Sequence, residues 1–146
     1  MNRKQAFLLK LYGCGYIVEA IEKVPAVCEI KNYQEVYIMA IIHAKTEEEI
    51  FRHVGGDKAI VLNFWASWCG PCQMFANVLN EVDEDYADKV QVIKVNVDEA
   101  QELAGAFQVQ GIPHSRIIIG DGMTDPITGF VPYGQMQQIL DEVLKK

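Results

Sequence analysis

The chain has 146 residues, of which half are hydrophobic and 23% are charged, and this predicts one globular domain with at most a short appendage. Its net charge of −7 gives no electrostatic basis for general nucleic-acid binding. No apolar run approaches the ~20 residues that a membrane span needs, so we expect neither nucleic acid nor a membrane as a partner.

Charge is distributed unevenly along the chain. Residues 1–38 carry five Lys/Arg and four Asp/Glu, whereas residues 39–146 carry eight and sixteen. We therefore expect the folded domain to span 39–146, and residues 1–38 to be a weakly ordered extension or the result of a start site assigned too early. Arg3-Lys4 and the apolar residues after them leave export open as well, although Lys10 interrupts that run.

The first predicted elements alternate between strand and helix. An apolar strand over 39–44 leads to Thr46, which forms a capping box with Glu49 at the start of a short helix that ends near Gly55. The apolar run 59–65 predicts a buried second strand. The helix after it is predicted by one apolar face, made of Phe75, Val78, Leu79, Val82 and Tyr86.

The second half of the chain continues this alternation. Residues 90–97 predict a strand, and 117–119 form the centre of another strand before a turn at 120–122. A last short strand is expected over 125–130, antiparallel to its predecessor because no helix separates them. Two further helical faces consist of Ala100, Leu103, Ala104 and Phe107, and of Met136, Ile139, Leu140, Val143 and Leu144. The alternation predicts an α/β layered fold.

A compact motif, Trp-Ala-Ser-Trp-Cys-Gly-Pro-Cys, occupies residues 65–72 between the second strand and the following helix. Cys69 and Cys72 can close a small disulfide ring. At a helix N-terminus the first sulfur lies where backbone N–H groups and the macrodipole favour an anion, which lowers the thiol pKa from about 8.5 and favours thiol–disulfide exchange. A zinc site would need two more ligands, and Cys14 and Cys28 do not form a second close pair.

The motif at 65–72 closely resembles that of the thioredoxin family, and the resemblance covers 39–146, about three quarters of the chain. Further matching segments are Gly111-Ile112-Pro113, Lys94-Val95-Asn96-Val97-Asp98 and Gly129. The resemblance implies a thioredoxin fold, which is a three-layer α/β sandwich with a central five-stranded mixed sheet flanked by four helices.

The resemblance also implies how the site works. Cys69 would attack a substrate disulfide and Cys72 would resolve the mixed disulfide, with Lys94 and Asn63 at the other catalytic positions. A cis peptide before Pro113 would shape a groove for an extended peptide. The residues expected to bind substrate are Trp68, Gly70, Pro71, Gly111, Ile112, Pro113, His114 and Gly129. Neither a metal nor a bound cofactor is expected.

Asn63 departs from the family pattern, because thioredoxins usually carry a buried aspartate there that resembles a general base for the resolving thiol. An amide cannot titrate, so we expect slower resolution by Cys72 near pH 7. Lys94 would then keep its charge without that carboxylate.

Three residues after the expected cis peptide also depart from the pattern. His114 stands where threonine is usual, and its position is equally consistent with a groove residue and with a simple substitution. Ser115 and Arg116 place polar side chains at the start of the strand around 117–119, where apolar residues are usual.

Together these features predict a monomeric, cytoplasmic protein-disulfide reductase that acts as a general electron donor in redox homeostasis. Its partners would be disulfide-containing proteins and thioredoxin reductase, an NADPH-dependent flavoprotein. Two alternatives stay open: an exported reductase of the cell envelope, and a scaffold subunit whose cysteines are incidental. The intact pair Cys69 and Cys72 argues against the scaffold.

Overall fold

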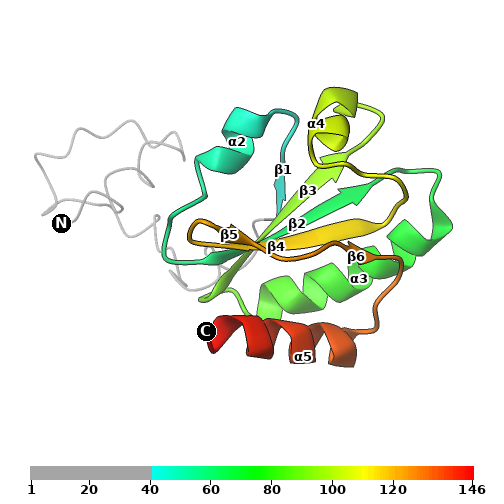
Figure 1. The fold of residues 1–146 in the computed structure, drawn as a ribbon. Coiled ribbons are helices and arrows are strands. Elements are labelled where there is room, and N and C mark those ends of the chain that lie inside the picture. Colours follow the sequence, from blue (N-terminus) through cyan, green and yellow to red (C-terminus); the bar gives the residue numbers. More distant parts are fainter. Residues whose placement is uncertain (1–40) are drawn as a thin grey trace, which may run out of the picture. The chain divides into compact units, whose positions relative to one another are not determined.

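The computed structural model describes residues 41–146, so the predictions for residues 1–38, including Cys14 and Cys28, lie outside the described residues. Helices and strands alternate through most of this range, as the sequence predicts (Figure 1). The elements are β1 (Ile42–His43), α2 (Glu47–Phe51), β2 (Ala59–Trp65), α3 (Gly70–Asp85), β3 (Val90–Asn96), α4 (Gln101–Ala106), β4 (His114–Ile119), β5 (Gly122–Met123), β6 (Ile127–Thr128) and α5 (Tyr133–Leu144).

A mixed sheet forms the centre of the described fold. Its strand order is β1-β3-β2-β4-β5, and β6 also pairs with β4. Strands β1, β3 and β2 are parallel to one another, whereas β4 runs antiparallel to β2 and to both short strands that follow it. The long strands β2 and β3 pair along all seven of their residues, which makes them the rigid middle of the sheet.

The last strand expected over 125–130 is shorter than predicted, since β6 spans only Ile127–Thr128, and another short strand, β5, lies at Gly122–Met123, next to the predicted turn. The cause lies at Thr124, whose hydroxyl accepts from Ile117 N at 3.0 Å in place of a backbone carbonyl. Pro126 follows and has no N–H to donate to a ladder. Both short strands pair antiparallel with β4, as expected for the last strand.

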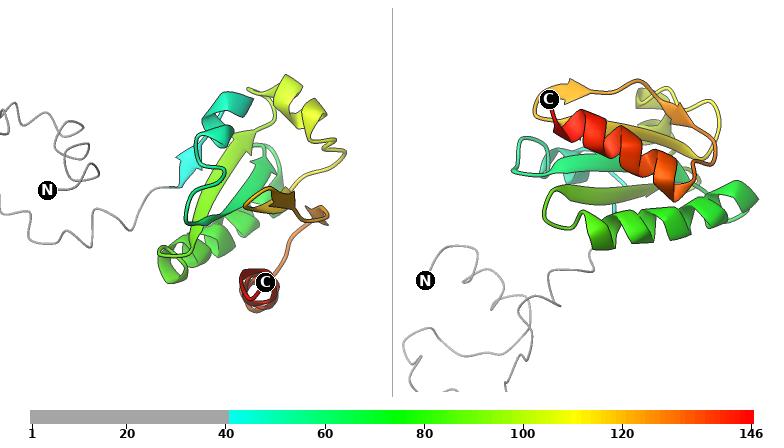
Figure 2. Two further views of the ribbon diagram at one scale, coloured as in Figure 1. Left: turned by 60° about the vertical axis from the view of Figure 1, so that its left-hand side comes forward. Right: turned by 90° about the horizontal axis from the view of Figure 1, so that it is seen from below.

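Two layers of helix cover the sheet, with α2 and α4 on one face and α3 and α5 on the other (Figures 1 and 2). Side chains alternate between the faces along β2, because successive residues of a strand point to opposite sides. Val61 packs with Phe75 and Leu140 on the α3/α5 face, whereas Leu62 packs with Ile50 on the α2/α4 face. Each face therefore has its own apolar core.

Local sequence signals account for where the helices begin. The predicted capping box of α2 is confirmed, since Thr46 Oγ1 accepts from Glu49 N at 3.3 Å and the Glu49 carboxylate accepts from Thr46 N. Helix α3 begins directly after Cys69, with Pro71 in its first turn, where the missing N–H has no helical partner to lose. The start of α3 thus fixes both cysteines relative to the end of β2.

Candidate active site

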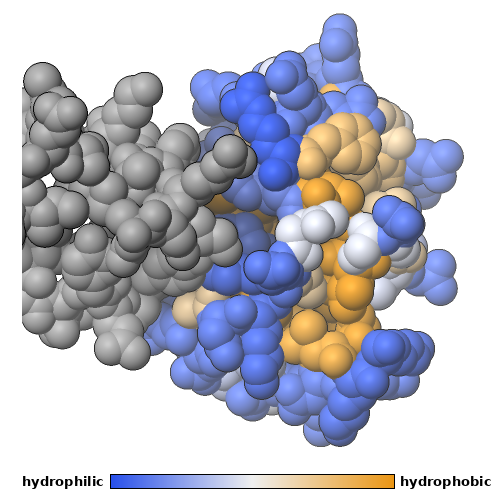
Figure 3. Space-filling view, turned by 90° about the vertical axis from the view of Figure 1, so that its left-hand side faces the viewer, coloured by the Kyte–Doolittle hydropathy of each residue, from blue (hydrophilic) through white to orange (hydrophobic). Residues whose placement is uncertain are grey.

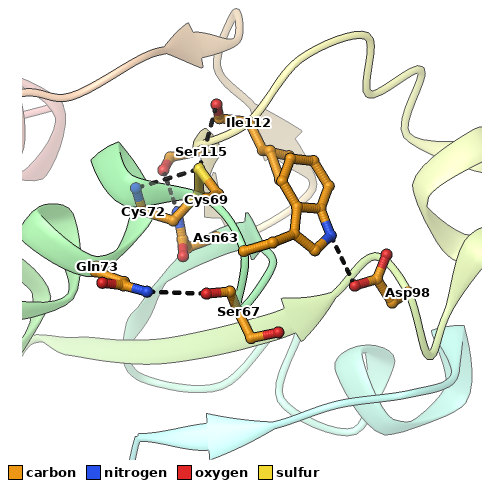
Figure 4. Close-up of a disulfide and its surroundings, with 9 residues drawn as sticks. Asn63, Ser67, Cys69, Cys72, Gln73, Asp98, Ile112 and Ser115 are labelled. Atoms are coloured by element: carbon orange, nitrogen blue, oxygen red, sulfur yellow. Dashed lines mark hydrogen bonds between the residues drawn. A yellow bond between two sulfur atoms is a disulfide. The ribbon is translucent and has the colours of Figure 1, made fainter.

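Cys69 and Cys72 form a disulfide at the N-terminus of α3, with their Cα atoms 5.3 Å apart (Figure 4). Cys69 is the N-cap residue, and its Sγ accepts a hydrogen bond from Cys72 N at 3.3 Å. The two residues are only 6% and 4% exposed. In the reduced state, the same N–H and the dipole of α3 favour negative charge on the Cys69 sulfur.

The wall opposite the disulfide comes from the segment that enters β4. The Ile112–Pro113 peptide bond is cis, and the Ile112 carbonyl oxygen lies 3.8 Å from Cys69 Sγ. Pro113 O accepts from Gly129 N at 2.8 Å, and Gly129 has a φ of +82°, a conformation that favours glycine. Residues predicted at three separate places in the sequence therefore meet beside the cysteines.

Trp68 is the most exposed large apolar side chain of this site, at 69%. Its Nε1–H donates to Asp98 Oδ2 at 2.9 Å, which ties the loop before α3 to the loop after β3 (Figure 4). Gly70, Pro71 and Gly111 are also exposed. An aromatic surface held in place next to a disulfide suits contact with the apolar side chains of a polypeptide substrate.

Beneath the disulfide, four polar residues lie in register across four strands. His43 of β1, Lys94 of β3, Asn63 of β2 and Ser115 of β4 are successive partners, so they share the α3/α5 face of the sheet. Asn63 Nδ2–H donates to Ser115 Oγ at 3.1 Å (Figure 4), and these two residues are 2% and 1% exposed. A neutral hydrogen-bonded pair thus occupies the floor of the site.

Lys94 adds a cation to this floor. Its Nζ lies 4.7 Å from the centroid of the Trp65 ring, a cation–π contact, and burial lowers the pKa of its ammonium. Trp65 in turn packs against the cluster of Ala66, Cys69 and Cys72. Trp65 therefore contacts both the lysine and the cluster that contains the two cysteines.

His114 lies on the other side of the sheet. It is the register partner of Phe64, makes an edge contact with that ring at 5.7 Å between centroids, and is 2% exposed. Burial and, secondarily, the charge of Arg116 lower the pKa of its imidazole. The structure does not support a direct contact between this side chain and substrate, because strand alternation turns it into the interior.

Sequence reasoning missed two contacts of the site. The bond between Trp68 and Asp98 has no local signal, since the two residues lie in different loops that only the fold brings together. The partner of Asn63 could have been suspected, because Ser115 is a polar residue at the start of an apolar strand. Pairing the two required the β2–β4 register.

Two features of residues 41–146 bear on other functions. No group of three His, Cys, Asp or Glu side chains in this range is arranged to hold a metal ion. None of the described helices combines the length and apolar character needed to cross a membrane.

An open pocket of about 530 Å³ lies away from the cysteines, on the α2/α4 side, between α2, the end of α4 and the β4–β5 turn. Phe51 and Met123 line it and are both more than half exposed, and Arg116 reaches it from the sheet. Figure 3 shows apolar surface bordered by hydrophilic side chains on this side of the molecule. Glu47 and Asp121 also line the pocket, so its charge is mixed.

The comparisons with known proteins agree with one another. The family model described as Thioredoxin matches residues 39–142. The thioredoxin of Bacillus subtilis (strain 168) is 36% identical over 107 residues, which are 73% of this chain and 100% of that protein. The thioredoxin of Alicyclobacillus acidocaldarius is 39% identical over 100 residues, 68% of this chain and 95% of that protein.

Solved structures show the same similarity. A thioredoxin of Malassezia sympodialis superposes with a TM-score of 0.63 at 27% identity, covering 70% of this chain and 90% of that one. The family match contains every site residue named above, from His43 to Gly129.

Proposed function

We propose a role as a general protein-disulfide reductase, starting from the finding that this chain belongs to the thioredoxin family. Members of that family are disulfide oxidoreductases, and this chain is a thiol–disulfide reductase that works through Cys69 and Cys72. The observation that carries the proposal is the placement of this disulfide at the N-terminus of α3, opposite the cis peptide at Pro113.

The reaction follows from this geometry. In the reduced protein the Cys69 thiolate attacks one sulfur of a substrate disulfide, and the other substrate sulfur leaves as a thiolate and takes up a proton. Cys72 then loses its proton and attacks Cys69 Sγ, which releases the second substrate thiol and forms the disulfide seen here. Two electrons pass from the protein to the substrate in one cycle, and of the two protons that the substrate sulfurs take up, one is lost by Cys72 and one comes from the solvent.

Substrate would lie across the exposed side of this centre. The exposed Trp68 and the strand-like edge at Ile112 flank the disulfide and provide an apolar contact and backbone hydrogen-bonding groups for an extended chain. Cys69 and Cys72 are only 6% and 4% exposed, so an incoming disulfide reaches the Cys69 sulfur after a small local opening of the residues around it. Cys69 attacks first because it is the N-cap residue of α3, whereas Cys72 lies inside the first turn of the helix.

More specifically, we propose that the protein is a cytoplasmic, monomeric electron donor for many proteins. Thioredoxin reductase, an NADPH-dependent flavoprotein, would recharge it. The resemblance of Cys-Gly-Pro-Cys to the reducing members of the family supports this proposal, as does the similarity to the thioredoxins of Bacillus subtilis and Alicyclobacillus acidocaldarius. A reducing compartment would keep the pair as a dithiol.

The test is reduction of insulin disulfides driven by dithiothreitol. We expect the wild-type chain to accelerate precipitation of the insulin B chain, and Cys69→Ser to abolish that acceleration. Cys72→Ser should instead accumulate a mixed disulfide with insulin, visible by non-reducing electrophoresis. Wild-type activity no greater than that of Cys69→Ser would contradict a general reductase.

Recharging is tested separately, by following NADPH oxidation with insulin, the wild-type chain and a purified bacterial thioredoxin reductase. Turnover that requires all three components supports the proposed electron donor. Turnover with dithiothreitol but none with the reductase would contradict that part of the proposal and leave the reductase activity of the chain intact.

A further inference from the structure

The open pocket on the α2/α4 side shares no lining residue with the site of the cysteines. Its larger lining side chains are mostly apolar and come from the ends of α2 and α4, from β4 and from β5: Phe51, Val54, Phe107, Ile118 and Met123. Phe51 and Met123 are 56% and 51% exposed, so apolar surface stays open to solvent there (Figure 3). A concave, mainly apolar site of about 530 Å³ with few polar groups has the usual form of a small-molecule site.

Arg116 brings a cation to this pocket from the sheet. It is a half-buried residue of β4, and it lines the pocket together with Ile118, whereas Ile117 between them packs into the core on the other face. Strand β4 is paired on both of its sides, with β2 on one and with β5 and β6 on the other. A guanidinium in such a strand gives up part of its hydration, which is costly unless an anion or a set of acceptors binds it.

The hydrogen bonds of Arg116 within residues 41–146 are incomplete. Its Nη1–H donates to Thr124 O at 3.2 Å, whereas its Nε is buried without a partner. None of the ion pairs found within this range involves Arg116. Its charge is felt in the interior, since it adds to burial in lowering the pKa of the His114 imidazole. The pocket therefore contains a positive charge that the described residues do not neutralise.

We propose that this pocket binds a small apolar monocarboxylate, whose carboxylate pairs with the Arg116 guanidinium and whose aromatic or branched aliphatic body packs against Phe51 and Met123. The planar guanidinium matches the geometry of a carboxylate and forms strong, charge-assisted hydrogen bonds with it. The proposal is separate from the reductase function, because none of the lining residues belongs to the site of the cysteines.

Two acidic residues of the pocket limit the charge of the ligand. Glu47 and Asp121 line the pocket, are exposed to water that screens them, and form no ion pair with Arg116. They would still repel a ligand of higher negative charge. One guanidinium can balance one carboxylate, whereas a phosphate monoester with a charge near −2 would be disfavoured.

The experiment titrates the full chain with hydrocinnamate, which joins a phenyl ring to one carboxylate, and follows backbone amide resonances by NMR. Hydrocinnamamide is the neutral analogue of the same shape, and phenyl phosphate is the dianionic one. For hydrocinnamate we expect a Kd of about 1 mM and shifts concentrated at Phe51, Phe107 and Met123. The other two compounds should bind about tenfold more weakly, because each lacks the single negative charge.

Arg116→Met tests the cation, because methionine keeps an apolar stem and removes the charge. This variant should weaken hydrocinnamate binding by about tenfold and leave hydrocinnamamide binding near its wild-type value. Arg52→Met is the matched control. Arg52 is an exposed cation at the end of α2 that pairs with Glu48 and does not line the pocket, so its removal should leave both affinities unchanged.

Arg116→Met also removes the hydrogen bond to Thr124, so a second variant leaves that bond in place. Met123→Glu adds a carboxylate at a half-exposed lining position, where the fold tolerates a polar side chain. Repulsion should weaken hydrocinnamate binding by about threefold or more and spare hydrocinnamamide. Thermal unfolding of each variant verifies that it is folded, and Met123→Glu decides the question if Arg116→Met is not.

Three results would overturn the proposal: equal affinities for hydrocinnamate and its amide, undiminished hydrocinnamate binding in folded Arg116→Met or in Met123→Glu, and no saturable shift of the pocket resonances up to about 20 mM ligand. Cys69→Ser should bind hydrocinnamate as the wild type does. The pocket can therefore bind its ligand in a chain that proves inactive on insulin, and it can fail to bind in a chain that reduces insulin normally.

Discussion

At the scale of single residues, Asn63 is the position where the site differs most from a thioredoxin with a buried aspartate. Its amide is satisfied by Ser115 and cannot exchange a proton, so the interior carries one ionisable group fewer. The energetic benefit is the avoided cost of a buried carboxylate, and the chemical cost is the loss of a proton acceptor near Cys72.

Asn63→Asp should therefore speed the single-turnover reduction of a substrate disulfide near pH 7 by about tenfold, since general-base help is worth at least that much in well-placed sites. It should also lower the free energy of unfolding by about 1–3 kcal/mol, because a carboxylate enters a buried position. Stopped-flow rates across pH and urea titrations measure the two effects.

The control for Asn63→Asp is Asn80→Asp, which adds the same charge at an exposed position of α3. It should change neither quantity. Equal single-turnover rates for wild type and Asn63→Asp at every pH would refute the idea that residue 63 limits resolution.

His114 makes stability depend on pH in the acid range. Its imidazole has a folded-state pKa lowered by burial and by Arg116, and its Nε2 has no partner among the described residues. The unfolded chain therefore binds more protons below pH ~6.5, so the stability contributed by neutral His114 is present above that pH and is lost as the pH falls.

We expect His114→Phe to make the urea midpoint less sensitive to pH between about 7 and 5 than that of the wild type. His53→Phe, at a partly exposed position after α2, should keep the wild-type dependence. If His114→Phe and wild type lose stability in parallel over this range, the buried imidazole is not responsible.

The cysteine pair could be predicted from local sequence, whereas the positions of Pro113 and Gly129 beside it were expected only from the resemblance to the thioredoxin family. The spacing of Cys69 and Cys72 after a strand and before a helix requires the sulfur pair at a helix N-terminus. The side-chain direction of His114 could not be predicted in this way, because one residue of strand register decides between the groove side and the interior.

At the scale of elements, α3 and α5 are joined by two tyrosine–aspartate hydrogen bonds that run in opposite directions. Tyr86 at the end of α3 donates to Asp141 Oδ1 of α5 at 2.9 Å, and Tyr133 at the start of α5 donates to Asp85 Oδ2 of α3. These bonds link the helix that carries the cysteines to the C-terminal helix.

This helix pair predicts an alkaline loss of stability. Burial, helped by the bond to Asp85, raises the pKa of Tyr133 from 10.0 to about 12. A group whose folded pKa is raised stabilises the fold fully below its unfolded pKa, and that contribution is lost as pH rises from about 10 to about 12.

Tyr133→Phe should lower the free energy of unfolding by about 1 kcal/mol at pH 7. Above pH 10, the free energy of unfolding of this variant should fall less steeply with pH than that of the wild type. Thermal unfolding followed by circular dichroism at the two pH values measures both effects. A variant as stable as the wild type at pH 7 would show that the tyrosine–aspartate bond contributes nothing to the fold.

Periodicity predicted the long elements because each has one face in an apolar core. Strand β2 and helix α3 contribute buried residues at the expected spacing, so their existence and order follow from the sequence. Strand β5 and the exact bounds of β6 could not be predicted, since they depend on a Thr124 hydroxyl that replaces a backbone acceptor. Two-residue strands leave no periodic signal.

At the scale of the whole molecule, the apolar cores and the cysteine site lie within residues 41–146. The domain boundary at residue 39 remains a prediction, and the family match beginning at 39 is consistent with it. A protein consisting of residues 39–146 should retain insulin reductase activity within about twofold of the full chain, since a domain with its own core folds by itself.

Activity and thermal unfolding of the 39–146 protein, compared with those of the full chain, make this test. A loss of reductase activity together with an unchanged unfolding transition would mean that residues 1–38 take part in function. A lower unfolding transition would mean that the domain begins earlier than predicted.

The two faces of the central sheet carry different properties, and β2 alternates between them. Asn63 and Trp65 belong to the face of the dithiol, while Phe64 between them belongs to the face of His114 and the open pocket. Substitutions on the face of the dithiol can therefore change the redox behaviour, whereas substitutions on the face of His114 can change the stability or the pocket. Such a partition lets an enzyme diversify its stability and surface without altering its electron chemistry, which is a basis for evolvability.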